Sequence, residues 1–390
     1  MTTGFEFHCP TKIVAGVHAL DKIPDELASQ HVAHPLVMTD PGLAKLGVSA
    51  KLTRVLDAAG VPYDVYDQVP ADSSMDVVNE VAHLYAARGC DGFIAIGGGS
   101  VIDTTKGAAA SLSCEGADFA TLQGSEILHA DLPPIIAVPT TAGTGSEVTL
   151  VAVVADTKQH AKLSFTSYKL VPHVAVLDPD LTSSLPPKLT ATTGMDALTH
   201  AIEAYIGGST TRLTRAMAEE AARLIAQNLR AAYRDGHNLA ARRNMLRAAY
   251  CAGIAFTRSY VGYVHGVAHS LGGQYGVPHG LANAVILPYF LEAYGPACHQ
   301  KLGRLAIAAG IAKKGDSPAA ASEAFIRWIR EMNASMGIPE HIPQIRREDI
   351  PIMAHHASRE SNPLYPVPVL MDEHELADMY IRLMPEEVSA

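Results

Sequence analysis

The alternation of short apolar runs with amphipathic stretches in the first half of this 390-residue chain most constrains its fold. Four apolar runs bounded by turn residues are typical of buried strands: 35–40, 62–67, 92–96 and 134–138. Helical patterns lie between them, as at 49–59 and 75–88. Strands that alternate with helices predict a parallel sheet with helices on both faces. Three further short runs between 149 and 178 predict an extension of that sheet.

The second half of the chain has a different pattern. A polar stretch that contains prolines, 181–187 (LTSSLPP), predicts a domain boundary. Beyond it the sequence is rich in Ala, Leu and Arg at helical spacing, as at 215–234 and 240–256, with almost no alternation of β-branched residues. We therefore expect an α/β domain over residues 1–185 and an all-α domain over residues 186–390.

Charge and cysteine content exclude several classes of protein. The net charge of −10 argues against a nucleic-acid or anionic-membrane partner. Five cysteines, widely spaced and without C-x-x-C, indicate free thiols in a reducing compartment. The first residues show no signal-peptide pattern, and no apolar run reaches the roughly 18 residues of a spanning helix. We expect a cytoplasmic protein with no membrane or nucleic-acid partner.

Two segments of the second half carry metal-ligating side chains at helical spacing. Asp196 and His200 are four residues apart, as are His265 and His269, so each pair would share a helix face. His279 follows between Pro and Gly. One carboxylate with several imidazoles suits Fe²⁺ or Zn²⁺ and is too rich in nitrogen for Ca²⁺ or Mg²⁺. A single such pair is more often incidental, but two pairs and a further histidine predict a metal centre.

Polar loops follow two of the expected strands in the first half. A glycine turn between a strand and a helix would present backbone N–H groups to a pyrophosphate: Gly97, Gly98, Gly99 and Ser100. It is not G-x-G-x-x-G, because position 102 is Ile, and tight strand–helix packing explains the glycines equally well. After the next run come three hydroxyl side chains: Thr140, Thr141 and Thr144. Two such loops at neighbouring strand ends predict a ligand crevice.

Three motifs together resemble those of the iron-containing, group III alcohol dehydrogenases: GMDALTHAIEAY (194–205), HGVAHSLGGQYGVPHG (265–280) and PTTAGTGSEVT (139–149). The resemblance spans essentially the whole chain. It implies the dehydroquinate synthase-like fold, with an NAD-binding first domain and a metal-binding, catalytic second domain.

The resemblance also implies roles for individual residues in the second half. It implies four metal ligands: Asp196, His200, His265 and His279. It sets His269 apart, as a side chain beside the substrate that relays a proton or positions the substrate rather than binding the metal. Fe²⁺ is the implied ion, and the same ligand types accept Zn²⁺.

Cofactor contacts follow from the resemblance in the same way. Asp40 ends an apolar run, where an acid accepts hydrogen bonds from an adenosine ribose and repels a 2′-phosphate. In the family an Asp there accompanies NAD, although Asp-Pro-Gly at 40–42 is also a good turn or helix cap. The resemblance further places Lys162 at the nicotinamide ribose and Leu181 or Thr182 beside the adenine.

These features predict an enzyme that transfers a hydride between NAD(H) and a small alcohol or aldehyde. A divalent cation at the carbinol oxygen lowers the pKa of the alcohol and polarises the carbonyl in reverse. The nicotinamide must also be held close to the carbinol carbon in a dry cleft. We expect NAD on the sheet domain, the metal in the helical domain, and a homodimer or higher homo-oligomer.

Several positions depart from the usual family pattern. Ala71 replaces an Asn that contacts cofactor, so that contact is not carried over. Arg258, in the run 256–260 (FTRSY), stands where the family usually has no charge. Its guanidinium either reaches solvent or binds a carboxylate on the substrate. No site is assigned to 362–366 (NPLYP), and 355–356 is expected to be a surface pair of histidines.

Alternative functions remain open on the sequence. Arg258 makes a dehydrogenase of hydroxy acids or other anionic alcohols the first alternative. A dehydroquinate-synthase-like lyase needs several lysines around a polyanionic substrate, and no lysine lies within the metal motifs. Glycerol-type dehydrogenases dispense with one of the four ligands, and a non-catalytic scaffold needs none of them.

Overall fold

A computed structural model describes residues 10–113, 124–125, 128, 130–156 and 161–385. The chain forms two compact units, one of Met1–Thr141 with Gly145–Ser184, and one of Ala142–Thr144 with Leu185–Ala390. The short segment Ala142–Thr144 thus leaves the first unit and belongs to the second. Each unit has its own buried apolar core.

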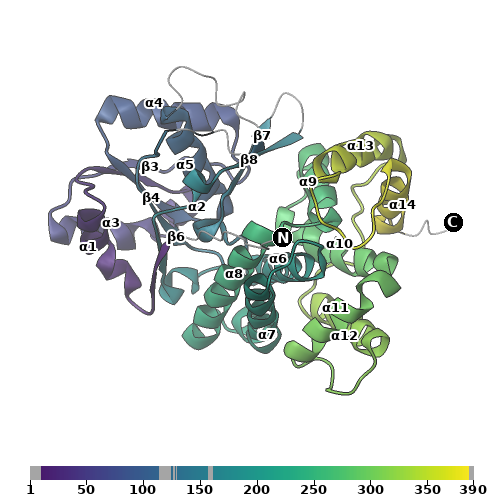
Figure 1. The fold of residues 1–390 in the computed structure, drawn as a ribbon. Helices are drawn as coiled ribbons and strands as arrows, with labels where there is room; N and C mark the ends of the chain where they lie inside the picture. Colours follow the sequence, from purple (N-terminus) through teal and green to yellow (C-terminus); the bar gives the residue numbers. More distant parts are fainter. Residues whose placement is uncertain (1–9, 114–123, 126–127, 129, 157–160, 386–390) are drawn as a thin grey trace, which may run out of the picture. The chain divides into compact units, whose positions relative to one another are not determined.

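The first unit is built on a six-stranded parallel sheet of order β1-β9-β6-β4-β2-β3. Figure 1 shows this unit, with the strands β3, β4 and β6 of the sheet labelled. Its strands are β1 (Lys12–Ala15), β2 (Pro35–Met38), β3 (Asp64–Tyr66), β4 (Gly92–Gly97), β6 (Ile135–Pro139) and β9 (Val174–Leu177). The strands β2, β4, β6 and β9 are buried along their whole length, which explains their continuous apolar sequences.

Helices cover both faces of this sheet, as the sequence predicted. They are α1 (Ile23–Ser29), α2 (Pro41–Lys45), α3 (Ser49–Ala59), α4 (Met75–Arg88) and α5 (Gly99–Leu112). Successive side chains of β4 point to opposite faces. Phe93 and Ala95 pack in the core that α4 and α5 share, whereas Ile94 and Ile96 pack in the core of α1 and α3.

The predicted sheet extension over 149–178 is wrong in its arrangement. The strand β9 lies inside the main sheet, between β1 and β6. The strands β7 (Val151–Asp156) and β8 (Ala161–Thr166) pair antiparallel in a separate sheet with β5 (Gly124–Ser125). The burial patterns give the reason: β9 is buried on both faces, whereas buried and half-buried residues alternate along β7 and β8.

The order of strands creates a switch point between β2 and β4. From β2 the chain moves to β3 on one side, and then returns to β4 on the other. In open parallel sheets, ligands bind outside the carboxyl ends of the strands at such a point. Asp40 follows β2 and the glycine turn follows β4, so both lie at the edge where a dinucleotide is expected.

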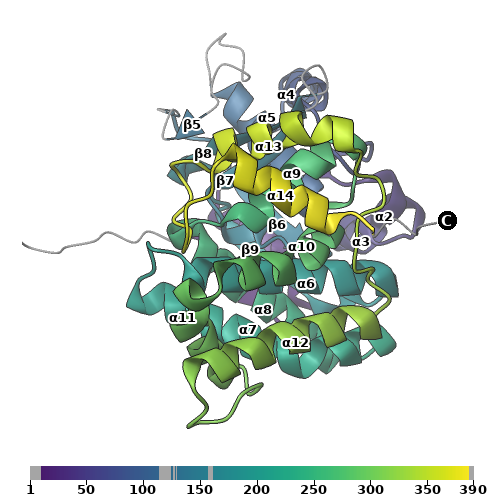
Figure 2. The same ribbon diagram turned by 90° about the vertical axis from the view of Figure 1, so that its right-hand side faces the viewer.

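The second unit is helical, as predicted. Its helices are α6 (Pro187–Ile206), α7 (Arg212–Arg234), α8 (Leu239–Ser259), α9 (Tyr263–Tyr275), α10 (His279–Tyr294), α11 (Pro296–Ala308), α12 (Pro318–Ser335), α13 (Ile350–Ser361) and α14 (Glu373–Leu383) (Figure 2). Helix α6 is buried all round from Gly194 to Ile206, because α7, α8, α10 and α11 pack against it. Among the described residues, no helix combines the length and apolarity that crossing a bilayer requires.

Candidate functional site

Three helices of the second unit bring the four predicted metal ligands together. Helix α6 carries Asp196 and His200 one turn apart, α9 carries His265, and His279 is the first residue of α10. One donor atom from each lies within 4.8 Å of the others. Asp196 Oδ1 is 3.4 Å from His279 Nε2 and 3.8 Å from His265 Nε2. Three ligands are buried and His279 is half-buried, so the group opens on one side.

A glycine permits the close approach of α10 to α6. A Cβ atom at Gly280 would lie 2.7 Å from the carbonyl oxygen of Thr192, closer than real Cβ atoms come. Any other residue at 280 would therefore push the start of α10, and with it His279, away from Asp196. The glycine of the Pro-His-Gly motif has a steric reason that the sequence did not reveal.

The electrostatic state of the cluster suits a divalent ion. Nε2 of His265 and Nδ1 of His200 are buried, and neither has a hydrogen-bond partner among the described residues. Burial and the neighbouring histidines hold the pKa of His265 well below its ordinary value, and burial lowers the pKa of His200. Neutral imidazoles are the form that binds metal. The residues therefore fit an ion, which would satisfy buried nitrogen atoms that otherwise lack a partner.

Two side chains that the sequence did not single out hold the ligands in place. Glu203 Oε2 lies 2.5 Å from His265 Nδ1, and its other oxygen accepts the Val264 N–H at 2.9 Å. Asn283 donates to Asp196 Oδ1 at 2.6 Å. Burial raises the pKa of Glu203 to about 8. Helical spacing was the available signal, because Glu203 lies seven residues after Asp196, and Asn283 four after His279.

Replacing Glu203 with alanine is expected to lower metal affinity about 10–100-fold. The change leaves the buried Nδ1 of His265 and the Val264 N–H without their acceptor. Glu203→Gln keeps an acceptor and should lose less. Competition with a chromophoric chelator measures the affinity, and Glu323→Ala, at an exposed position of α12, is the matched control. Equal affinity of wild type and Glu203→Ala would show that Glu203 does not support the ligand.

His269 lies one turn beyond His265 on α9 and makes different contacts. Its Nδ1 is 2.6 Å from Oε1 of Glu360 on α13, and the Tyr365 hydroxyl donates to the same oxygen at 2.7 Å. Its ring stacks on that of His279 with centroids 5.1 Å apart. The imidazole is thus oriented by a carboxylate beside the ligand cluster, an arrangement suited to holding or passing a proton.

The end of α8 borders the same cluster through Phe256. The Phe256 ring stacks on His200 with centroids 4.2 Å apart. Arg258 is two residues further along this helix, or about 200° around its axis, so it points to another face. It is half-buried and makes no hydrogen bond or ion pair with the described residues. The predicted role of Arg258 in holding an anionic substrate therefore gains no support.

The glycine turn allows close packing of a strand on a helix, and it leaves the first N–H groups of that helix without a capping side chain. A Cβ atom at Gly97 would lie 2.4 Å from the side chain of Val101, so this glycine serves close strand–helix packing. Gly98 is the extended N-cap of α5, which begins at Gly99. No side chain caps this helix, so its first N–H groups remain suited to an anion. Ser100 turns its hydroxyl to the carbonyl oxygen of Ala71 at 2.5 Å.

The other residues predicted to bind the cofactor differ in their burial and in their hydrogen-bond partners. Asp40 caps α2 by accepting the Leu43 N–H at 2.9 Å, which is the helix-cap alternative. Thr140 is buried and Thr141 is half-buried, both directly after β6. Lys162 of β8 forms an ion pair of 2.7 Å with Asp72. Their contacts with a cofactor remain predictions.

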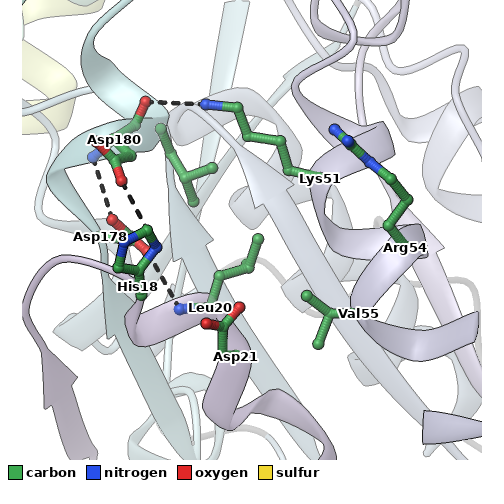
Figure 3. A pocket seen from close by; sticks show the side chains of 9 residues that line it. His18, Leu20, Asp21, Lys51, Arg54, Val55, Asp178 and Asp180 are labelled. Atoms are coloured by element: carbon green, nitrogen blue, oxygen red, sulfur yellow. Dashed lines mark hydrogen bonds and ion pairs between the residues drawn. The ribbon is translucent and has the colours of Figure 1, made fainter. Parts of the chain in front are cut away.

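Leu181 lies against a hollow of about 340 Å³ in the first unit (Figure 3). The hollow follows the carboxyl ends of β1 and β9, and its other lining residues are His18, Leu20, Asp21, Lys51, Arg54, Val55, Asp178 and Asp180. Asp178 accepts the N–H groups of Leu20 and Asp180, while Lys51 donates to the Asp180 carbonyl oxygen. Leu181 itself is buried, so its contact with an adenine stays a prediction.

Comparison with known protein families covers both units. Residues 10–179 match the family model described as "Iron-containing alcohol dehydrogenase". Residues 190–384 match the model described as "Fe-containing alcohol dehydrogenase family, C-terminal". The chain belongs to the iron-containing alcohol dehydrogenase family. The resemblance inferred from the three motifs is thereby confirmed, and the chain is an alcohol dehydrogenase-type oxidoreductase.

Characterised relatives of this iron-containing alcohol dehydrogenase match it over most of its length. The 1,3-propanediol dehydrogenase of Citrobacter freundii is 38% identical over 380 residues, which are 96% of this chain and 98% of the relative. The lactaldehyde reductase of Escherichia coli K12 is 37% identical over 345 residues, 88% of this chain and 90% of the relative. These relatives favour the alcohol dehydrogenase prediction over the lyase and the scaffold.

Solved structures of the family show the same fold. A 1,3-propanediol oxidoreductase superposes with a TM-score of 0.93 at 36% identity, covering 98% of this chain and all of the other. Sulfoacetaldehyde reductase from Bifidobacterium kashiwanohense, in complex with NAD⁺, gives a TM-score of 0.85 at 29% identity, covering 99% and 100%. The expected combination of a parallel-sheet unit and a helical unit is confirmed.

Proposed function

We propose that this protein interconverts small uncharged alcohols and aldehydes with NAD(H), using one Fe²⁺ or Zn²⁺ ion bound by Asp196, His200, His265 and His279. The observation that carries the proposal is the convergence of these four donor groups within 4.8 Å. One carboxylate and three imidazoles match the preference of both ions. When bound, the ion supplies a Lewis acid that stabilises negative charge on the substrate oxygen.

The remaining residues of the helical unit would orient the substrate and handle its proton. Glu203 fixes the ring of His265, and Asn283 fixes the carboxylate of Asp196. His269, held by Glu360, is the group we assign to holding or passing the proton of the carbinol oxygen. Phe256 covers one side of His200 and keeps water from that ligand.

NAD(H) is the proposed coenzyme of the sheet unit. The uncapped start of α5 would bind the pyrophosphate, and Asp40 would bind the adenosine ribose across the switch point between β2 and β4. The NAD⁺ complex of the sulfoacetaldehyde reductase supports this choice for a homologous fold. The further candidate contacts are Thr140, Thr141, the half-buried Thr144, Lys162 and Leu181.

Short neutral hydroxyaldehydes and diols are the proposed substrate class. The relatives named for 1,3-propanediol and lactaldehyde support this class, and helix geometry places Arg258 on a different face of α8 from Phe256, which borders His200. The test is a steady-state NADH-oxidation screen of short aldehydes and oxoacids after loading with Fe²⁺ or Zn²⁺. We expect the highest kcat/KM for a neutral aldehyde. A higher value for an oxoacid or for succinic semialdehyde would overturn the substrate class.

Replacing Asp40 with glycine is expected to raise the ratio of NADPH to NADH specificity constants at least about tenfold, or about 1.4 kcal/mol. The change removes a charge that repels the 2′-phosphate, and glycine at an N-cap costs α2 only a few tenths of a kcal/mol. Asp40→Asn keeps the cap and removes only the charge, so it should shift the ratio in the same direction.

Asp67→Asn is the matched control, because this acid follows the edge strand β3 rather than the switch point. Initial rates with both coenzymes at several concentrations give the ratio. A wild-type protein that already prefers NADPH would refute the assignment of Asp40.

A further inference from the structure

A second group of metal-ligating side chains lies at the amino ends of the parallel strands. The glycine turn lies at their carboxyl ends, on the opposite side of the sheet. Among the residues that the structure describes, His34, Asp64 and Cys90 have donor atoms within 4.8 Å of one another. His34 directly precedes β2, Asp64 begins β3, and Cys90 lies two residues before β4. Since β3, β2 and β4 are parallel neighbours, all three residues lie together at the amino ends of these strands.

The backbone around this group is fixed by hydrogen bonds. The Asp91 carboxylate accepts the N–H groups of Ala33 and His34, both at 2.8 Å, and the Asp91 N–H donates to the His34 carbonyl oxygen at 3.1 Å. Gly89 ends α4 with a φ of +64°, which turns the chain towards Cys90. The segments that carry His34 and Cys90 are therefore tied together without any ligand.

The Cys90 thiol has no partner of its own. It is 8% exposed, and its sulfur makes no hydrogen bond with the described residues, although it faces the donor atoms of His34 and Asp64. Asp64 divides its oxygens between two neighbours: Oδ2 is 3.1 Å from His34 Nε2, and Oδ1 is 3.7 Å from Arg88 Nε. The arrangement leaves the sulfur as an unused donor beside a carboxylate and an imidazole.

The distances suit tetrahedral coordination of zinc. Zinc bonds of about 2.0–2.3 Å at tetrahedral angles place neighbouring donor atoms about 3.2–3.7 Å apart. The 3.1 Å separation of His34 and Asp64 is already close to that range, and small side-chain movements bring Cys90 into it. The Arg88 side chain is 60% exposed and can remain on the other oxygen of Asp64 or move into solvent.

A redox role for the same thiol is disfavoured. Burial and the carboxylates of Asp64 and Asp91 raise the pKa of Cys90 to about 11. A free thiol in this setting stays protonated near neutral pH and is a poor nucleophile. A divalent cation reverses that balance, because it stabilises the thiolate directly.

We propose that His34, Asp64 and Cys90 bind one Zn²⁺ ion, separate from the ion of the helical unit. On binding, the S–H proton is released to solvent as the zinc–sulfur bond forms, and water takes the fourth position. The six residues of β4 span about 20 Å between its amino end and the glycine turn, so the ion touches neither coenzyme nor substrate. It joins the amino ends of three strands, and its expected effect is on thermal stability rather than on turnover.

Titration with Cd²⁺ of enzyme that carries one equivalent of Fe²⁺ and no Zn²⁺ tests the site by a signal that the other metal centre cannot give. Cadmium bound to a thiolate has a charge-transfer band in the ultraviolet, and the ligands Asp196, His200, His265 and His279 include no sulfur. We expect the band to saturate at one equivalent per chain and to disappear when excess Zn²⁺ is added. Absence of the band at millimolar Cd²⁺ would refute the site.

Variants identify the ligands. Cys90→Ser should abolish the band and leave the kcat for aldehyde reduction unchanged, whereas Cys251→Ser, at a buried thiol of α8, should retain the band. His34→Gln should weaken Cd²⁺ binding about tenfold or more, and His83→Gln, at an exposed position of α4, should not. A band that persists in Cys90→Ser, or full affinity in His34→Gln, would overturn the proposal. Because His34 is partly exposed, its variant decides the question even if Cys90→Ser folds poorly.

Discussion

Replacing His265 with alanine is expected to remove most of the bound metal and to lower turnover at least about 10³-fold. The side chain is buried, its Nε2 faces Asp196 at 3.8 Å, and its Nδ1 is held by Glu203. Alanine removes one of four donors and leaves the Glu203 carboxylate buried without its partner. Loss of the Lewis acid raises the barrier by several kcal/mol, and each 1.36 kcal/mol is tenfold in rate.

Two measurements test the prediction for His265→Ala. Elemental analysis of the purified variant gives the metal content, and NADH oxidation with a short aldehyde gives the rate. His237→Ala, at an exposed position before α8, should keep both at the wild-type level. Thermal unfolding in the presence of chelator separates loss of the ion from loss of the fold. A folded His265→Ala variant with full metal content would show that His265 is not a ligand.

The His269→Ala variant is expected to keep its metal and to lose about 10²–10⁴-fold in kcat. His269 is one turn from His265 but is oriented by Glu360, and its ring stacks beside His279. Removing it leaves the four donor atoms in place and takes away the group assigned to the proton of the substrate oxygen. The dependence of kcat on pH should also change, which a purely structural role would not produce.

A graded series makes this prediction sharper. Glu360→Gln keeps an acceptor for His269 Nδ1 but removes the charge, so its loss in kcat should be smaller than that of His269→Ala. Tyr365→Phe removes the donor to the same carboxylate and should have a still smaller effect. Metal content should be unchanged in all three variants. Loss of metal together with activity in His269→Ala would make His269 a ligand instead.

The sequence predicted those features that depend on short separations. Asp196 and His200 share a helix face because they are four residues apart, and the continuous apolar strands are recognisable because both of their faces are buried. The glycine turn and Asp40 were found in the same way, as polar residues directly after such strands. The competing explanations for Gly97 and Asp40, packing and helix capping, are both present in the structure.

Features that depend on distant parts of the chain could not be predicted. Glu360 reaches His269 across 91 residues, and no local pattern distinguishes it from a surface acid. The group of His34, Asp64 and Cys90 exists only because the strand order places β2 between β3 and β4. The strands β7 and β8 were assigned to the wrong sheet because a short apolar run does not reveal its pairing partner.

Anomalous diffraction at the absorption edge of the loaded metal tests the central claim most directly. Crystals of enzyme loaded with Zn²⁺ or Fe²⁺ should give a strong peak about 2.0–2.2 Å from Asp196, His200, His265 and His279, with His269 outside bonding distance. The four donor atoms already lie within 4.8 Å of one another, so only small movements are required. A peak bonded to His269, or the absence of a peak within this group in a fully active crystal, would contradict the account.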